Sequence, residues 1–183
     1  YPQQSGTLHI GQSSMTVVAQ IVVQSRSHSQ SLFDDFFGGQ SVQEVRKNLS
    51  AAPVPVTVRD FPAGAPASFN GAVGKFQLNG SLDKQTVTAN ASDTYLLKLS
   101  GSGNLPLIQA PKPELPASFE SYGNGKSTES LSHNASGISG YKQFEFPFIP
   151  RAEGNYSIPP VEFSYFDPDA AKYVTLTTPP FGV

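Results

Sequence analysis

Three phenylalanines at alternate positions, Phe144, Phe146 and Phe148, dominate the segment Tyr141–Ile149. Successive side chains of a β-strand point to opposite faces, so this spacing gathers the three rings on one face. A face of that size has to be covered by another layer of structure. The same alternation recurs in three further segments, at Phe76, Leu78 and Leu82, at Tyr95, Leu97 and Leu99, and at Val161, Phe163 and Tyr165. The pattern predicts core strands of packed sheets.

More strands are predicted at Met15–Gln24, Val54–Arg59 and Lys172–Thr177, whereas Val42–Leu49 fits either a short helix or a strand. The 16 Gly and 16 Pro of the 183 residues indicate many turns, and the 14% of charged residues argues against a coiled coil or helical repeat. Seven or so strands between Phe61 and Val183 predict an all-β fold, an immunoglobulin-like β-sandwich.

A tyrosine corner is predicted at Arg151–Ile158. In immunoglobulin-like sandwiches, a Tyr that follows a tight corner donates a hydrogen bond to the upstream backbone. Glu153, Gly154 and Tyr156 fit the sequence form of this corner. The alternative is a turn followed by an ordinary strand tyrosine.

An internal repeat links the beginning of the chain to its end. Ser5–Ile10 aligns with Glu153–Ile158, and Asn48–Val56 aligns with Thr175–Val183. The matched residues are Pro2 with Pro150, Gly6 with Gly154, Ile10 with Ile158, Leu49 with Leu176, Pro53 with Pro180, and Val56 with Val183. The first copy is longer by about 21 residues between the two matches.

The repeat predicts two domains. Residues 1–59 would be the C-terminal strands of a preceding immunoglobulin-like domain, with an inserted loop at 25–44, and residues 60–183 a complete sandwich. An isolated pair of strands is marginally stable and has unpaired edges. We therefore expect the first segment to pack on the second domain or to exchange strands with another molecule, which would give a homodimer.

Composition excludes several classes of function. The net charge of −2 gives no electrostatic footprint for nucleic acid or an anionic membrane. The absence of cysteine excludes disulfides, thiolate metal sites and a cysteine nucleophile. No apolar stretch approaches the roughly 20 residues of a spanning helix, no leader is visible, and the first residue is Tyr1. We expect a non-enzymatic fragment of a longer chain, without contact to a membrane.

The inserted loop is the candidate binding segment, with the residues Leu32, Phe33, Asp34, Asp35, Phe36 and Phe37. Aromatic anchors beside acids are typical of a docking peptide, because the rings supply buried area and the acids steer a basic partner. In the alternative, the rings cap the sandwich as a small apolar cluster and the acids face water. Adjacent acids do not fix the geometry of a catalytic pair.

Other polar residues give no site. His9, His28 and His133 are scattered, so neither a metal nor a cofactor is expected. Asp167–Asp169 is typical of a turn, and Gly101–Asn104 of a strand end, because no helix pattern follows it. The sequence has N-x-S/T sites at Asn48, Asn79, Asn90, Asn134 and Asn155, which fit an extracytoplasmic protein.

Several longer stretches resemble one family. They are Phe33–Gly39, Gly71–Leu78, Ser100–Ile108 and, most specifically, Ile149–Leu176. Together they resemble the BatD oxygen-tolerance (aerotolerance) proteins over nearly the whole chain. The resemblance implies the periplasmic region of a membrane-anchored bacterial protein, built of consecutive immunoglobulin-like domains. It also implies von Willebrand A-type and tetratricopeptide proteins and a MoxR-type ATPase as products of neighbouring genes, and no catalytic residue or cofactor.

The favoured function is a non-catalytic scaffold or interaction module of the cell envelope. The alternative is a carbohydrate-binding module, for which Tyr122, Tyr165 and Tyr173 would be stacking platforms. The absence of tryptophan, the usual platform, argues against that alternative.

Overall fold

The structure is a computed structural model and describes residues 2, 4–23, 41–84, 86–123, 125–135 and 137–183. The chain forms two units, which we call the sandwich unit (Phe61–Val183) and the ribbon unit (Pro2–Asp60). Strands make up almost all regular structure of the described residues, with one short 3₁₀ helix and no α-helix. The predicted all-β, immunoglobulin-like fold class is confirmed.

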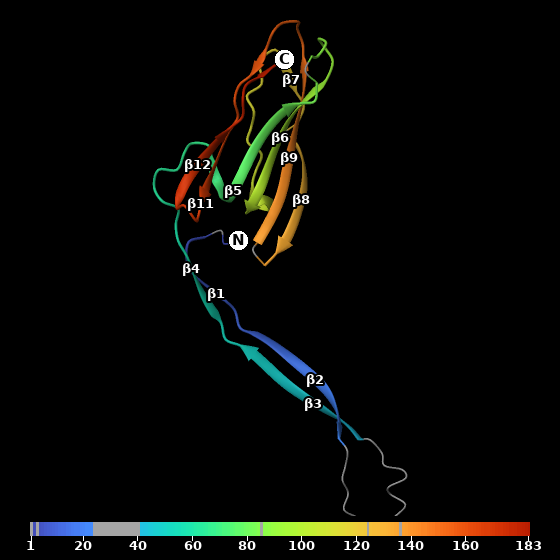
Figure 1. The fold of residues 1–183 in the computed structure, drawn as a ribbon, viewed down its shortest axis with the longest axis vertical. Helices are drawn as coiled ribbons and strands as arrows, with labels where there is room; N and C mark the ends of the chain where they lie inside the picture. Colours follow the sequence, from blue (N-terminus) through green and yellow to red (C-terminus); the bar gives the residue numbers. More distant parts are fainter. Residues whose placement is uncertain (1, 3, 24–40, 85, 124, 136) are drawn as a thin grey trace, which may run out of the picture. The chain divides into compact units, whose positions relative to one another are not determined.

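The main strands of the sandwich unit form two sheets that share one long strand, β5 (Figure 1), and β10 pairs antiparallel with β13 in a separate two-stranded sheet. Its strands pair in the order β12-β11-β5-β6-β9-β7, and β8 also pairs with β9. The elements are β5 (Phe69–Leu82), β6 (Asp93–Gly103), η1 (Leu105–Leu107), β7 (Phe119–Ser121), β8 (Lys126–Asn134), β9 (Gly137–Pro150), β10 (Ser157–Ile158), β11 (Glu162–Asp167), β12 (Lys172–Thr177) and β13 (Phe181–Gly182). The first part of β5 pairs in parallel with β11, and the part from Gly74 onward pairs antiparallel with β6.

Glycines allow β5 to pass from one sheet to the other. Gly74 lies opposite Gly103 in the β5–β6 ladder, and both have φ near +145°. A Cβ atom at Gly74 would overlap the carbonyl oxygen of Ser102. Beside this point, the buried Asn104 accepts a hydrogen bond from the Val73 amide at 2.8 Å. Residues Gly101–Asn104 therefore end a strand, as predicted.

The core lies between the two sheets, on the faces that the alternation predicted. Phe76 of β5 contacts Phe163 and Tyr165 of β11 edge-to-face, with ring centroids 5.9 and 5.3 Å apart. Three of the predicted triplets are all buried: Tyr95, Leu97 and Leu99 on β6; Phe144, Phe146 and Phe148 on β9; and Val161, just before β11, with Phe163 and Tyr165 on β11. Period-two alternation therefore identified these core faces, whereas the buried Leu105, Ile108, Phe119 and Ile158 lie outside the predicted pattern, and the predicted Leu78 and Leu82 are only partly buried.

The corner before β10 is held by Tyr156. Its hydroxyl lies 3.2 Å from the carbonyl oxygen of Ala152, four residues upstream, to which it donates a hydrogen bond. Its ring contacts Phe119 edge-to-face at 5.1 Å. Gly154 leaves room for that ring, because a Cβ atom there would lie 3.1 Å from it. These contacts attach the corner to the core.

The ribbon unit is a long antiparallel hairpin of four strands (Figure 1). β1 (Gly6–Ile10) pairs with β4 (Val54–Val58), and β2 (Ser13–Val23) pairs with β3 (Ser41–Ala51). Val42–Leu49 is therefore strand, and the helical alternative is wrong, because cross-strand pairing with β2 decides its conformation. Residues Ser41–Glu44, predicted as loop, also belong to β3.

Candidate functional site

The candidate binding segment Leu32, Phe33, Asp34, Asp35, Phe36 and Phe37 lies outside the described residues. The chain reaches this segment from β2 and leaves it into β3. Its two interpretations, docking peptide and apolar cap, stay predictions. The sites considered below lie in the described part of the chain.

The ribbon unit has one apolar and one polar face. Along β2 and β3, the odd-numbered positions are mostly apolar, as at Met15, Val17 and Leu49, with Lys47 as an exception. The opposite face is mostly polar, apart from residues such as Val18, and includes the pair Thr16–Asn48, whose side chains hydrogen-bond at 2.8 Å. Such amphipathic strands normally have the apolar face packed on a core. Here, however, that face is exposed, to 59% at Met15 and 63% at Ile10. An uncovered apolar surface of this kind marks an interaction site.

Seven exposed residues of this surface, which we call the apolar face, are Leu8, Ile10, Met15, Val17, Leu49, Val54 and Val56, and the exposed Ile21 and Val45 lie beyond them on the same side of β2 and β3. Leu8, Ile10, Val54 and Val56 extend it along β1 and β4. The apolar positions are even-numbered there and odd-numbered in β2 and β3, since Gly11 and Gln12 separate β1 from β2. The repeat aligns Ile10 with Ile158 and Met15 with Phe163, and these two counterparts belong to one core cluster, so we treat the two sets of positions as one face.

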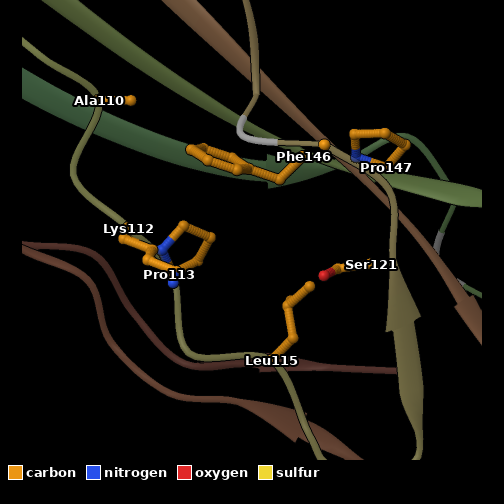
Figure 2. Close-up of a pocket in the computed structure, with 8 residues that line it drawn as sticks. Ala110, Lys112, Pro113, Leu115, Ser121, Phe146 and Pro147 are labelled. Atoms are coloured by element: carbon orange, nitrogen blue, oxygen red, sulfur yellow. The ribbon is translucent and has the colours of Figure 1, made fainter.

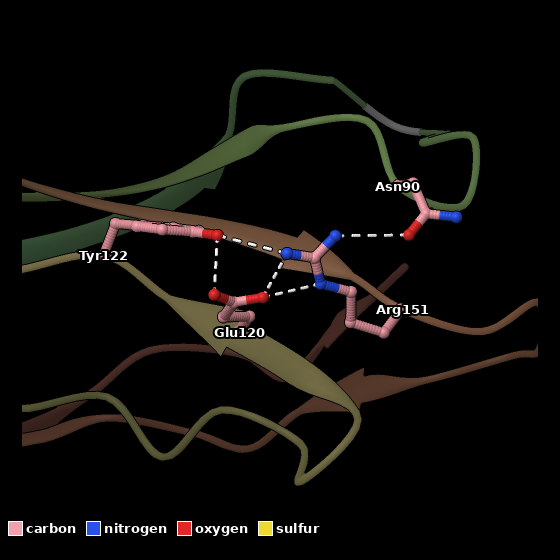
Figure 3. Close-up of polar contacts among 4 residues, drawn as sticks. All are labelled: Asn90, Glu120, Tyr122 and Arg151. Carbon is pink, nitrogen blue, oxygen red and sulfur yellow. Dashed lines mark hydrogen bonds and ion pairs between the residues drawn. The ribbon is translucent and has the colours of Figure 1, made fainter.

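The sandwich unit carries a polar cluster that joins three separate segments (Figure 3). Arg151 donates to Glu120 at 2.6 Å through Nε, and to Asn90 at 3.3 Å and Tyr122 at 3.2 Å through its other nitrogens. The hydrogen bond from Tyr122 and then that from Arg151 hold the pKa of the Glu120 carboxyl below its usual range. The charges of Arg151 and Glu120 neutralise each other, and their contacts link β7 to the residue that follows β9.

Two small pockets flank the extended segment that follows η1. The first, of about 220 Å³, is lined by Ala110, Lys112, Pro113, Leu115, Ser121, Gly123, Phe146 and Pro147 (Figure 2). The second, of about 250 Å³, lies beside Ser68, Asn70, Glu162 and Phe163. Ligand pockets usually measure about 300–1,000 Å³ and combine apolar walls with convergent polar groups. Both pockets are smaller than that, so neither supports a small-molecule site.

One buried acid, Asp93, stands apart from any cluster. Its Oδ1 accepts a hydrogen bond from the Lys84 amide at 3.1 Å, and its buried Oδ2 has no partner among the described residues. Burial raises the pKa of this carboxyl above its ordinary value, against the opposing effect of the backbone hydrogen bonds of Thr94 and Lys84. No group of three or more His, Asp or Glu that could hold a metal occurs in the described segments.

The predicted turn at Asp167–Asp169 is confirmed. The Asp167 carboxylate accepts hydrogen bonds from the amides of Asp169 and Ala170, at 2.9 and 3.1 Å. The side chain of Asp169 pairs with Lys75 at 2.7 Å. Asp167 thus stabilises the β11–β12 turn, and Asp169 links that turn to β5.

The tyrosines proposed as sugar platforms are engaged elsewhere. Tyr165 is buried in the core, so its predicted availability is wrong: it occupies an inward position of β11 against Phe76. Tyr173 packs against Phe69 and Phe166 and donates to the carbonyl oxygen of Pro62 at 2.7 Å. Tyr122 belongs to the Arg151 cluster. Of the three, only Tyr122 keeps a largely exposed side chain, at 47%, and carbohydrate binding stays an untested alternative.

Comparison with known proteins adds the family. A family model described as a BatD DUF11-like domain matches residues 80–183, which lie within the sandwich unit. The chain belongs to the BatD family. BatD domains are extracellular or periplasmic parts of membrane proteins, and the family is associated with aerotolerance. No curated protein and no solved structure matches the chain.

In the described part of the chain, no helix has the length and apolar character to cross a bilayer.

Sequence analysis missed the Arg151 cluster and the exposure of the ribbon. Glu120, Tyr122 and Arg151 are brought together only by the pairing of β7 with the end of β9. β7 is three residues long and has no apolar alternation, so no sequence signal marks it. The apolar pattern of β2 was visible, but alternation cannot say whether a partner layer is present.

Proposed function

We propose that this BatD chain is a non-catalytic interaction module of the periplasm, which acts through protein–protein contacts. The observation that carries the proposal is the length of the ribbon. In the sandwich unit, the β11–β12 hairpin turns directly after the pair Asp167–Lys172. In the repeat alignment, that pair corresponds to Ala19–Val45, yet β2 and β3 continue to pair as far as Val23 and Ser41.

The extension supports a presenting role. It lengthens the hairpin by four residue pairs beyond the shared part, with no counterpart in the sandwich unit. The chain that follows β2 contains the aromatic and acidic segment Leu32–Phe37. Aromatic residues dominate binding energy at protein interfaces, and acids accelerate encounter with basic surfaces. The extension therefore lengthens the hairpin from which the chain continues into this segment.

The partners proposed are the von Willebrand A-type and tetratricopeptide proteins that accompany BatD. The test is binding of the purified chain to each of these proteins, with the double variant Phe36→Ser, Phe37→Ser and a control double variant, Gln30→Ala, Ser31→Ala, in the same segment. We expect the first variant to lose binding, the control to keep it, and both to keep the melting temperature of the wild type. Binding that survives in the first variant would overturn the assignment of the segment.

A further inference from the structure

The ribbon unit and the last strands of the sandwich unit are paired in the same register. With the repeat aligned, Met15–Leu49 of the ribbon corresponds to Phe163–Leu176, and both are cross-strand pairs. Three further cross-strand pairs of the ribbon correspond to cross-strand pairs of the sandwich unit. Ile10–Val54 corresponds to Ile158–Phe181, Ser14–Ser50 to Glu162–Thr177, and Ala19–Val45 to Asp167–Lys172. Both hairpins also break at the same place, between β1 and β2 and between β10 and β11. The two are one structural element in two copies.

The copies differ in what covers them. Ile158 and Phe163 are 0% and 5% exposed, because the sheet of β5, β6 and β9 lies over them. Their counterparts Ile10 and Met15 are the most exposed residues of the apolar face. Leu49 and Val54 are exposed as well, although their counterparts, Leu176 and Phe181, pack against the core. The apolar face therefore coincides, position by position, with a surface that has a covering layer in the sandwich unit.

The strand edges differ in the same way. In the sandwich unit, β11 is flanked by β12 on one side and by the parallel strand β5 on the other, through the pairs Ser164–Phe69 and Phe166–Val73. The counterparts of Ser164 and Phe166 are Thr16 and Val18 of β2. Among the described residues, β2 pairs only with β3. The edge of β2 along Thr16–Val18 is therefore open where β11 carries a parallel strand.

We propose that the apolar face and the open edge of β2 form a binding site for the remaining strands of a second immunoglobulin-like sandwich. An edge strand of that partner pairs in parallel with β2 at Thr16–Val18. Its inner face places a large apolar side chain against Met15 and Val17, as Phe76 lies against Phe163 and Tyr165. This site is separate from the segment assigned to binding under the proposed function.

The occupant is supplied by the same polypeptide, N-terminal to the ribbon. In the sandwich unit, the covering strands β5–β9 come directly before β10 in the chain. A second copy of the 183 residues is disfavoured as the source of these strands, because its own β5, β6 and β9 already cover β10–β13. When one domain is repeated along a polypeptide, the strands that precede each final hairpin cover that hairpin.

The test is amide hydrogen exchange on the natural protein at full length and on the 183-residue chain. At full length, amides of Thr16–Val18 that face away from β3 should exchange at least ~10-fold more slowly than in the 183-residue chain. Outward amides of β3 at Arg46–Asn48 should exchange fast in both, because β12, the counterpart of β3, is an edge strand.

Two variants at neighbouring positions sharpen the test. Met15→Asp places a charge on the apolar face and should abolish the protection of β2 at full length. Ser14→Asp should keep it, because the counterpart Glu162 is exposed. Equal exchange in both proteins, or equal protection of both edges, would overturn the proposal. Protection that appears in the 183-residue chain as its concentration rises would also overturn it, in favour of a second copy as occupant. None of these outcomes depends on binding by Phe36 and Phe37.

Discussion

Truncation of matched residues in the two hairpins should have very different costs in the 183-residue chain. Phe163 is 5% exposed and contacts Phe76 edge-to-face at 5.9 Å. Phe163→Ala removes these contacts and leaves a cavity, which should cost about 3–5 kcal/mol of the free energy of unfolding of the sandwich unit. Met15 occupies the equivalent place but is 59% exposed. Since full burial of such a side chain contributes about 1.5–3 kcal/mol, Met15→Ala should cost at most about 1 kcal/mol.

The assay is thermal unfolding followed by near-ultraviolet circular dichroism and tyrosine fluorescence, since the chain has no tryptophan. For a unit of this size, about 1 kcal/mol corresponds to a shift of roughly 3–6 °C in Tm, so Phe163→Ala should lower Tm by more than about 10 °C. Met15→Ala should leave the transition of the sandwich unit where it is. A shift below about 3 °C for Phe163→Ala would refute the two-sheet core. Comparable shifts for both variants would refute the claim that only one hairpin is covered.

Three further predictions concern the sandwich unit. Tyr156→Phe keeps the ring but loses the hydroxyl hydrogen bond, so urea denaturation should show a loss of about 1 kcal/mol, and an unchanged midpoint would contradict the corner contact. Gly74→Ala forces a Cβ atom onto a backbone oxygen and should destabilise the unit by more than about 2 kcal/mol. The control Gly64→Ala has no atom within 4 Å of the added Cβ, so it should cost only the backbone strain of its positive φ, about 1 kcal/mol. Asp93 has a pKa raised by burial, so wild-type stability should fall as the pH rises from the ordinary carboxyl pKa of 3.8 to the raised value in the fold. The stability of Asp93→Asn relative to wild type should therefore improve from pH 3 to pH 7 in thermal melts, and a pH-independent difference would show that the carboxyl does not titrate as described.

The inward faces of the core strands could be predicted from the sequence because a strand has a fixed period of two. Phe144, Phe146 and Phe148 form one face whatever the rest of the chain does. Contacts between distant segments could not be predicted in this way. The Arg151–Glu120 pair depends on the pairing of β7 with β9, and β7 has no pattern of its own.

The burial of Tyr165 shows a second limit. The sequence pattern places Tyr165 on a core face, whereas its aromatic side chain would also suit an exposed platform for sugars. The packing of Phe76 against Tyr165 decides between these two predictions. The ribbon shows the converse. The strands of the ribbon alternate between apolar and polar residues, as β11 does, yet the apolar face of the ribbon is exposed. Alternation shows that a strand has an apolar face, and it does not show whether another layer covers that face.

The claim that the ribbon is the last hairpin of a second sandwich is tested most directly by cysteine labelling, because the chain has no cysteine of its own. Met15→Cys and Ser14→Cys differ by one position and lie on opposite faces of β2. In the natural protein at full length, a maleimide should modify Ser14→Cys rapidly and Met15→Cys at least ~10-fold more slowly, whereas both should react rapidly in the 183-residue chain. Equally rapid modification of both positions at full length would contradict the account.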